Sequence, residues 1–147
     1  MKAIQIIPSR SLFMTSLSML VIFTLLSACS KKINFNTSTV VPAAEGVVKI
    51  KKDSNKNSSV DIKIKNLAEP ERLEYPKSVY VVWMVTEENG IKNIGQLISS
   101  KSMFSSQLEG TLKTTTPFAP KRIFITAEDS SDISMPGSYV ILETKSF

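Results

Sequence analysis

The stretch VYVVWMVTEENGIKNIGQLIS, residues 79–99, decides the fold class because it has the pattern of two strands joined by a tight turn. Residues 79–86 are apolar at both alternating sets of positions, which predicts a central strand covered on both faces. Asn89 and Gly90 interrupt the apolar pattern, and this dipeptide favours a type I′ turn in which both residues have positive φ. Residues 91–99 form the predicted return strand.

Further strands are predicted on both sides of this hairpin. Residues 59–67 alternate between apolar and polar side chains, with Val60, Ile62 and Ile64 on one face, as in a half-buried strand of an antiparallel sheet. No segment of ten or more residues has a helical stripe. The other strands are expected at residues 45–52, 103–112, 122–128 and 138–147.

Loops separate these strands at intervals typical of a sandwich. Residues 68–78 and 114–121 contain prolines and are expected to be connections, and Pro136–Gly137 suits the central positions of a type II turn. The sequence therefore predicts an all-β fold over residues 45–147. We expect an immunoglobulin-like antiparallel β-sandwich of about seven strands, with a small Greek-key barrel as the alternative.

Residues 1–28 have the features of a cleaved signal peptide. Lys2 and Arg10 are the only charges before residue 31, and an apolar run follows whose strongly apolar part is about 15 residues, the length of a signal h-region. The sequence Leu26-Ser27-Ala28-Cys29 resembles the bacterial lipobox. This resemblance implies that the Cys29 thiol receives a diacylglycerol, that the chain is cut after Ala28, and that the new amine is acylated.

Cys29 is therefore the predicted lipidation site, which anchors the protein to a membrane. Several acyl chains hold a protein far more firmly than one, which gives only marginal binding. Two alternatives remain: an uncleaved N-terminal membrane helix, and an ordinary cleaved signal with a chance cysteine. Residues 29–44 are rich in Asn, Ser and Thr and are expected to be a flexible tether spanning roughly 20 Å. A competing interpretation places an early edge strand at residues 39–41.

The residue that follows Cys29 indicates the membrane to which the protein is sorted. Ser30, with no aspartate there, resembles the sorting signal for the outer membrane of two-membraned bacteria. We therefore expect a lipid-anchored protein of the bacterial cell envelope, at the outer membrane and facing the periplasm or the cell surface. In a one-membraned host the same anchor would hold the protein on the outer face of the plasma membrane.

Charge and composition restrict the chemistry. Without Lys2 and Arg10, 16 of the 18 basic residues remain against 13 acidic ones. The chain has no histidine and one cysteine, so a Ser-His or Cys-His pair is not possible. Serines and lysines are present, so the composition still allows a catalytic Ser-Lys pair. However, no SxxK or GxSxG pattern marks a nucleophile. No catalytic residue, cofactor site or metal ligand is assigned, and we expect a protein that is not an enzyme.

Two groups of acidic residues are candidate sites. Glu87 with Glu88, and the cluster of Glu128, Asp129 and Asp132, are candidate carboxylates for glycoside hydrolysis. The second group could instead bind calcium through its oxygen ligands. Both groups lie in predicted turns, where acidic residues normally cap or solvate the backbone. We favour the structural interpretation for both.

Basic and aromatic residues carry a similar ambiguity. Six lysines between Lys49 and Lys65 could meet acidic lipid headgroups or an acidic glycan, but a solvated sheet face with edge-protecting lysines is favoured.

Trp83 is expected in the core, with a sugar-stacking platform as the alternative. The same alternative applies to Tyr75, Tyr80, Phe104 and Phe118. Nucleic acid is not an expected partner.

Residues 75–147 contain YVVWMV, EENG, IGQL and FITAE, followed by a Pro-Gly turn into a final apolar strand. In these motifs the chain resembles the extracytoplasmic C-terminal domain of anti-sigma-K factors and related lipoproteins. The resemblance implies a β-sandwich in the cell envelope. Those factors also carry a cytoplasmic helical domain, often with a His/Cys zinc motif, and a Gly-rich corner where this chain has DSSD. Sigma-factor inhibition is therefore not carried over.

The expected function is that of a membrane-anchored envelope lipoprotein with a non-enzymatic binding domain and a protein or glycan partner. The alternative is a structural or accessory subunit of a cell-envelope assembly, in which an exposed strand edge pairs with a neighbour.

Overall fold

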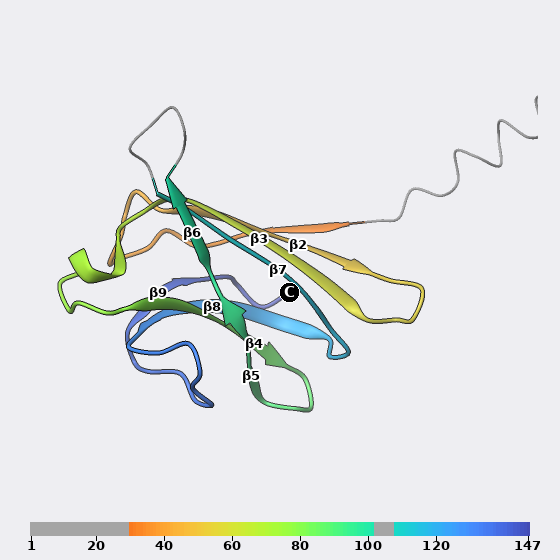
Figure 1. The fold of residues 1–147 in the computed structure, drawn as a ribbon. Coiled ribbons are helices and arrows are strands. Elements are labelled where there is room, and N and C mark those ends of the chain that lie inside the picture. Colours follow the sequence, from red (N-terminus) through yellow and green to blue (C-terminus); the bar gives the residue numbers. More distant parts are fainter. Residues whose placement is uncertain (1–29, 102–107) are drawn as a thin grey trace, which may run out of the picture.

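The computed structural model describes residues 30–101 and 108–147, which form two antiparallel sheets packed face to face (Figure 1). The signal peptide and Cys29 lie outside the described residues. A five-stranded sheet has the order β1-β2-β3-β7-β6, and a four-stranded sheet has the order β5-β4-β8-β9. The predicted all-β sandwich is confirmed.

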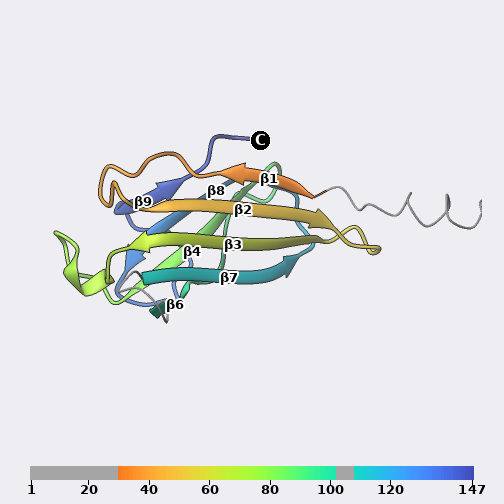
Figure 2. The same cartoon turned by 90° about the horizontal axis from the view of Figure 1, so that it is seen from above.

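The elements follow the chain as β1 (Lys31–Asn34), β2 (Glu45–Lys52), β3 (Ser58–Leu67), the 3₁₀ helix η1 (Pro70–Arg72), β4 (Val79–Thr86), β5 (Ile91–Gln96), β6 (Ile98–Lys101), β7 (Leu108–Thr116), β8 (Pro120–Glu128) and β9 (Val140–Glu143). Without β1, the two sheets read β2-β3-β7-β6 and β5-β4-β8-β9. These orders match the A-B-E-D and C′-C-F-G sheets of immunoglobulin sandwiches. Figure 2 shows the larger sheet lying across the smaller one.

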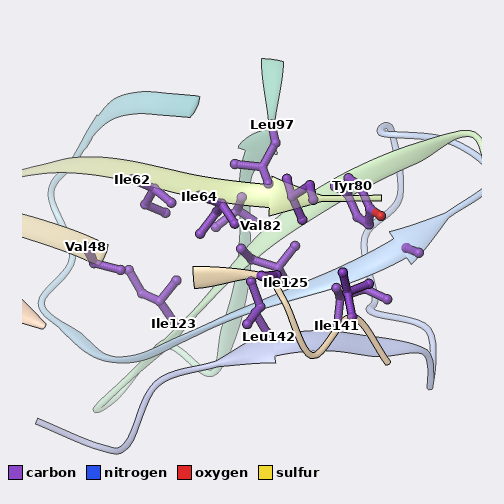
Figure 3. Packing of buried hydrophobic residues seen from close by; sticks show 14 of the residues in the cluster. Val48, Ile62, Ile64, Tyr80, Val82, Leu97, Ile123, Ile125, Ile141 and Leu142 are labelled. Carbon is purple, nitrogen blue, oxygen red and sulfur yellow. The ribbon is translucent and has the colours of Figure 1, made fainter. Parts of the chain in front are cut away.

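The core fills the space between the sheets (Figure 3). The alternating residues Val60, Ile62 and Ile64 of β3 are at most 1% exposed, as the period-two pattern predicts. They meet Ile123 and Ile125 of β8 in the same buried cluster. The apolar face of each sheet is thereby removed from water, which is the main force holding such a sandwich together.

Strand β4 is covered on both faces, as predicted. Its inward face carries Tyr80 and Val82 into the main core. Its outward face carries Val81 and Trp83 into a second small cluster, which Ile133 of the loop after β8 packs against. That loop is held over the outer face of the smaller sheet by a neighbouring strand. The side-chain nitrogen of Asn93 on β5 donates to the carbonyls of Ser131 and Ile133 at 3.0 and 2.9 Å.

The predicted return strand at residues 91–99 is two strands in different sheets. β5 pairs with β4, and β6 pairs with β7 in the opposite sheet. The chain crosses between the sheets at Leu97, whose side chain is 5% exposed and points into the core (Figure 3). Sheet membership is decided by distant partners, so a continuous strand pattern in the sequence does not show the crossover.

Both predicted turn types are wrong. Gly90 has a φ of 68°, but Asn89 is not among the residues with positive φ, so the β4–β5 hairpin does not have a type I′ turn. The hydroxyl of Thr86 instead stabilises this loop, accepting a hydrogen bond from the Asn89 N–H and donating one to the Gly90 carbonyl, each 2.9 Å long. Gly137 also lacks the positive φ that a type II turn requires.

The boundaries of β7, β8 and β9 also differ from expectation, and β9 covers only Val140–Glu143 of the predicted residues 138–147. The strand predicted at residues 103–112 is found as β7, which starts at Leu108 and continues to Thr116. Residues 102–107 lie outside the described residues. Because β7 is longer and β8 begins at Pro120, the predicted connection at residues 114–121 shortens to residues 117–119.

The predicted tether at residues 29–44 is wrong in its described part. β1 pairs with β2 in the larger sheet, and Phe35 forms a bridge to Thr144. Residues 39–41, the alternative edge strand, form a bend in which Val41 is buried. Ser38 is the reason that this polar segment can be buried. Its hydroxyl donates to the Ile141 carbonyl at 2.5 Å and accepts from the Val41 N–H at 2.9 Å.

The sandwich therefore begins at Lys31 rather than at Glu45.

Within the described residues, no helix has the length and apolarity needed to cross a membrane.

Candidate functional site

The acidic residues weighed as catalytic groups are not gathered into a site. Glu87 and Glu88 are exposed in the β4–β5 loop, and the Glu87 carboxylate pairs with the Lys121 ammonium at 2.8 Å. This pairing is typical of a solvated surface loop.

The candidate calcium ligands also do not converge on one site. The carboxylate of Glu128 is buried and accepts the Gly137 N–H at 2.8 Å. Asp129 pairs with Lys77 at 2.8 Å, and Asp132 is exposed. No group of three or more His, Cys, Asp or Glu side chains that could hold a metal ion occurs in the described part of the chain.

The aromatic residues form no exposed platform around Trp83. Trp83 is completely buried, stacks on Phe124 with 6.4 Å between ring centroids, and donates its indole N–H to the Thr126 hydroxyl at 2.8 Å. Its prediction as a core residue is confirmed. Tyr80 is also buried, and its hydroxyl donates to the Ala68 carbonyl at 2.9 Å.

The other aromatic residues weighed with Trp83 are scattered. Tyr75 is 61% exposed and packs edge-on against Tyr139, while Phe118 is half-buried beneath the ammonium of Lys92. Phe104 lies outside the described residues. A sugar-stacking surface built from these rings is therefore not assembled in the part of the chain that the structure describes.

The lysine-rich stretch forms the outer face of the larger sheet. Lys49, Lys63 and Lys65 are exposed there, in agreement with the favoured prediction of a solvated sheet face. Cross-strand register places Asp61 of β3 opposite Lys49 of β2 and opposite Lys113 of β7. The Lys113 ammonium lies 3.8 Å from Asp61 Oδ2.

An apolar groove beside β6 was not predicted from the sequence. A hollow of about 400 Å³ lies between the loop before β4 and the start of β6. Its apolar wall includes Tyr80, Leu97 and Leu108, each less than 9% exposed. Glu69 and Glu71 contribute carboxylates, and Glu69 also pairs with Arg72 at 2.8 Å.

Burial and charge both act on Tyr80 in this groove. Burial is the main cause that raises the pKa of the Tyr80 phenol above its ordinary value, and the nearby Tyr139 and Glu71 add to the effect. The phenol is therefore a neutral donor at physiological pH. It is fixed on the Ala68 carbonyl and supports the groove as a structural group.

Strand β6 forms one wall of the groove and is the last strand of its sheet. It pairs with β7 along one edge and ends the order of the larger sheet among the described residues. Ile98 at its start is 67% exposed. An edge strand with an exposed apolar side chain offers backbone groups to which another strand can bind. This groove and edge, lined by Glu71, Tyr80, Leu97 and Ile98, are called the β6 groove below.

No known protein-family model, curated protein or solved structure matches this chain.

Proposed function

We propose that this protein is a lipid-anchored component of the bacterial cell envelope, and that its sandwich acts by binding rather than by catalysis. The lipobox-like sequence ending at Cys29 supports the anchor, and the sandwich begins two residues later at Lys31. The resemblance of residues 75–147 to extracytoplasmic domains of anti-sigma-K factors and related lipoproteins supports the same compartment.

The β6 groove is the proposed binding site, and an extended segment of an envelope protein is the proposed ligand. The observation that carries this proposal is the exposed Ile98 on an edge strand beside an apolar hollow. A peptide strand added to β6 would gain main-chain hydrogen bonds, and its alternate side chains would enter the groove. The carboxylate of Glu71 favours a basic side chain in that segment. Buried Trp83 weighs against a glycan as the ligand.

The anchor is tested by replacing the predicted lipidation site. A Cys29→Ser variant should appear in the soluble envelope fraction, whereas wild type and a Ser30→Ala variant should stay with the membranes. Membrane attachment of the Cys29→Ser variant would contradict the anchor.

The binding site is tested in cells by placing a photo-cross-linking amino acid at Ile98. The matched control carries the same amino acid at Lys63, which is exposed on the outer face of the same sheet. We expect a defined protein adduct from position 98 and none from position 63. Adducts from position 63 alone would locate the interface on the lysine-rich face and refute the proposed site.

The alternative function is a structural or accessory subunit of an envelope assembly. The position of β6 at the end of its sheet, among the described residues, favours it, because an edge strand can join two chains into one permanent sheet. Two results distinguish the alternatives. A subunit should copurify with its neighbour in fixed proportion and lose stability alone, whereas a binding module should exchange its ligand. Ile98→Lys should weaken either interaction, because charge on an edge strand opposes pairing.

A further inference from the structure

Charged residues are distributed unevenly along the long axis of the sandwich. One end, called the anchor end here, contains the start of β1, the β2–β3 and β4–β5 hairpins, the β7–β8 connection and the last residues of the chain (Figures 1 and 2). Cross-strand register places these segments together, since Lys31 lies opposite Ile50, Ser58 opposite Thr116, and Thr86 opposite Pro120.

The anchor end is basic and the opposite end is acidic. Nine basic and three acidic residues lie at the anchor end, in residues 30–32, 51–58, 86–92, 114–122 and 144–147. The opposite end has four basic and eight acidic residues, in the described residues 36–45, 65–79, 96–101, 108–110 and 128–140. The molecule therefore has a strong charge asymmetry along the direction of its strands.

The β2–β3 hairpin shows why the anchor end presents positive charge. Asp53 is the acidic residue of this turn, and its Oδ1 accepts the N–H groups of Asn55 and Asn57 at 2.9 and 2.8 Å. Its Oδ2 accepts the side-chain amide of Asn57 at 3.2 Å. Asp53 keeps its negative charge, but Lys51, Lys52 and Lys56 outnumber it, so the hairpin has a net positive charge. The Lys52 ammonium also donates to the Ser58 hydroxyl at 3.0 Å.

The position of the predicted lipidation site places this end at the membrane. Lys31 stands two residues after Cys29, and two residues of extended chain span at most about 7 Å. That length is less than the Debye length of about 8 Å at physiological ionic strength, so charges on anionic headgroups are not fully screened at this distance. Lys31 and Lys32 of β1 and Lys51, Lys52 and Lys56 of the β2–β3 hairpin are all exposed at this end.

We propose that the anchor end docks on anionic lipid headgroups through the lysines of β1 and of the β2–β3 hairpin. This inference rests on the proposed lipid anchor at Cys29. The headgroup phosphates would pair with the exposed ammonium groups, and the acidic end, which carries Glu71 and the β6 groove, would point away from the bilayer. Juxtamembrane lysines bind anionic leaflets in this way, and the attraction weakens over distances of about one Debye length.

The test measures how fast each lysine is acetylated on a vesicle surface. The lipidated protein is reconstituted through its own anchor into vesicles of phosphatidylcholine, with or without phosphatidylglycerol, and acetylation is followed by mass spectrometry. Phosphatidylglycerol should slow acetylation of Lys52 and Lys56 several-fold and leave Lys65, which lies towards the other end of β3, unchanged. About 1 M salt, where the Debye length is about 3 Å, should remove the difference.

Paired variants provide the control. Lys52→Glu/Lys56→Glu should abolish the slower acetylation of Lys31 and Lys51, whereas Lys63→Glu/Lys65→Glu on the sheet face should not. Equal acetylation rates in both vesicle types would overturn the docking but leave the anchor intact. Slowing of Lys63 and Lys65 together with the hairpin lysines would overturn the end-on orientation. Failure of the protein to float with either vesicle type would instead refute the lipid anchor.

Discussion

The indole Nε1 of Trp83 donates a hydrogen bond of 2.8 Å to the hydroxyl of Thr126 on the neighbouring strand, and both residues are completely buried. Trp83 lies directly opposite Phe124, so Thr126 is its diagonal neighbour two residues along β8. Diagonal pairs on one face of a sheet are within reach of large aromatic side chains. This hydrogen bond lets a polar indole N–H be buried on the outer face of the smaller sheet, beneath the loop after β8.

Thr126→Val should destabilise the protein by about 1–3 kcal/mol, because it keeps the shape of the side chain and leaves the buried indole N–H without this acceptor. Thr126→Ser keeps the hydroxyl and should cost only the lost methyl group, about 0.8 kcal/mol. Urea unfolding followed by Trp83 fluorescence measures both. Equal midpoints for the two variants would mean that the hydrogen bond contributes no net stability.

Ser38→Ala should cost about 1–3 kcal/mol, since it removes a buried hydroxyl that bonds the Ile141 carbonyl and the Val41 N–H. Thr39→Ala, one residue further on at an exposed position, should change the free energy of unfolding by no more than about 0.5 kcal/mol. Thermal or urea unfolding of both variants checks the contrast. Matching small effects would show that this segment is loosely attached, as in the tether that the sequence predicted.

The free energy of unfolding should fall as the pH rises above about 10, the ordinary pKa of tyrosine. Burial, assisted by Tyr139 and Glu71, raises the pKa of Tyr80 in the folded state, so the folded protein keeps a proton that the unfolded chain loses. Stability from this group is complete below about pH 10 and decreases above it by up to about 1.4 kcal/mol per pH unit. Urea unfolding from about pH 9 to about pH 11 measures the slope. Tyr80→Phe should have a shallower slope, and an identical slope would rule out Tyr80 as its source.

Gly46→Ala should destabilise the protein by about 1–3 kcal/mol through overpacking. A Cβ atom at Gly46 would clash with Ile64 Cδ1 and lie 2.7 Å from Phe35 Cδ2. Ile64→Val removes the first of these atoms, so it should cost less in the Gly46→Ala background than alone. A double-mutant cycle by urea unfolding measures this coupling, expected to exceed about 0.5 kcal/mol. Additive effects would show that the added methyl group is accommodated elsewhere.

The sequence predicted the strands whose pattern is local. The alternation of Val60, Ile62 and Ile64 and the double-sided apolar character of residues 79–86 both report burial directly, and both are confirmed. The crossover at Leu97 was missed because β5 and β6 differ only in which distant strand they pair with. The β4–β5 turn was misjudged because the hydroxyl of Thr86 stabilises a loop that the Asn-Gly pattern does not describe.

The N-terminal segment and the β6 groove were missed for a related reason. Ser38 and Phe35 are held by Ile141 and Thr144, more than a hundred residues away, so nothing in the local composition separates this segment from a flexible linker. The groove combines residues from four separate stretches, around Glu71, Tyr80, Ile98 and Leu108, which only the fold brings together. By contrast, Glu87 and Asp132 are exposed in loops, which agrees with the interpretation of those acidic residues as turn residues.

The attachment of β1 along the edge of the larger sheet has a mechanical consequence. β1 runs antiparallel to β2 from Lys31 to Asn34, and the next residues are held by the Phe35–Gly46 and Asn36–Glu143 backbone hydrogen bonds. A tension applied between an anchored N-terminus and a ligand at the far end would run lengthwise along these strands. The hydrogen bonds would then be sheared together instead of being peeled apart one by one, and the edge strand would resist pulling from the membrane as a single unit.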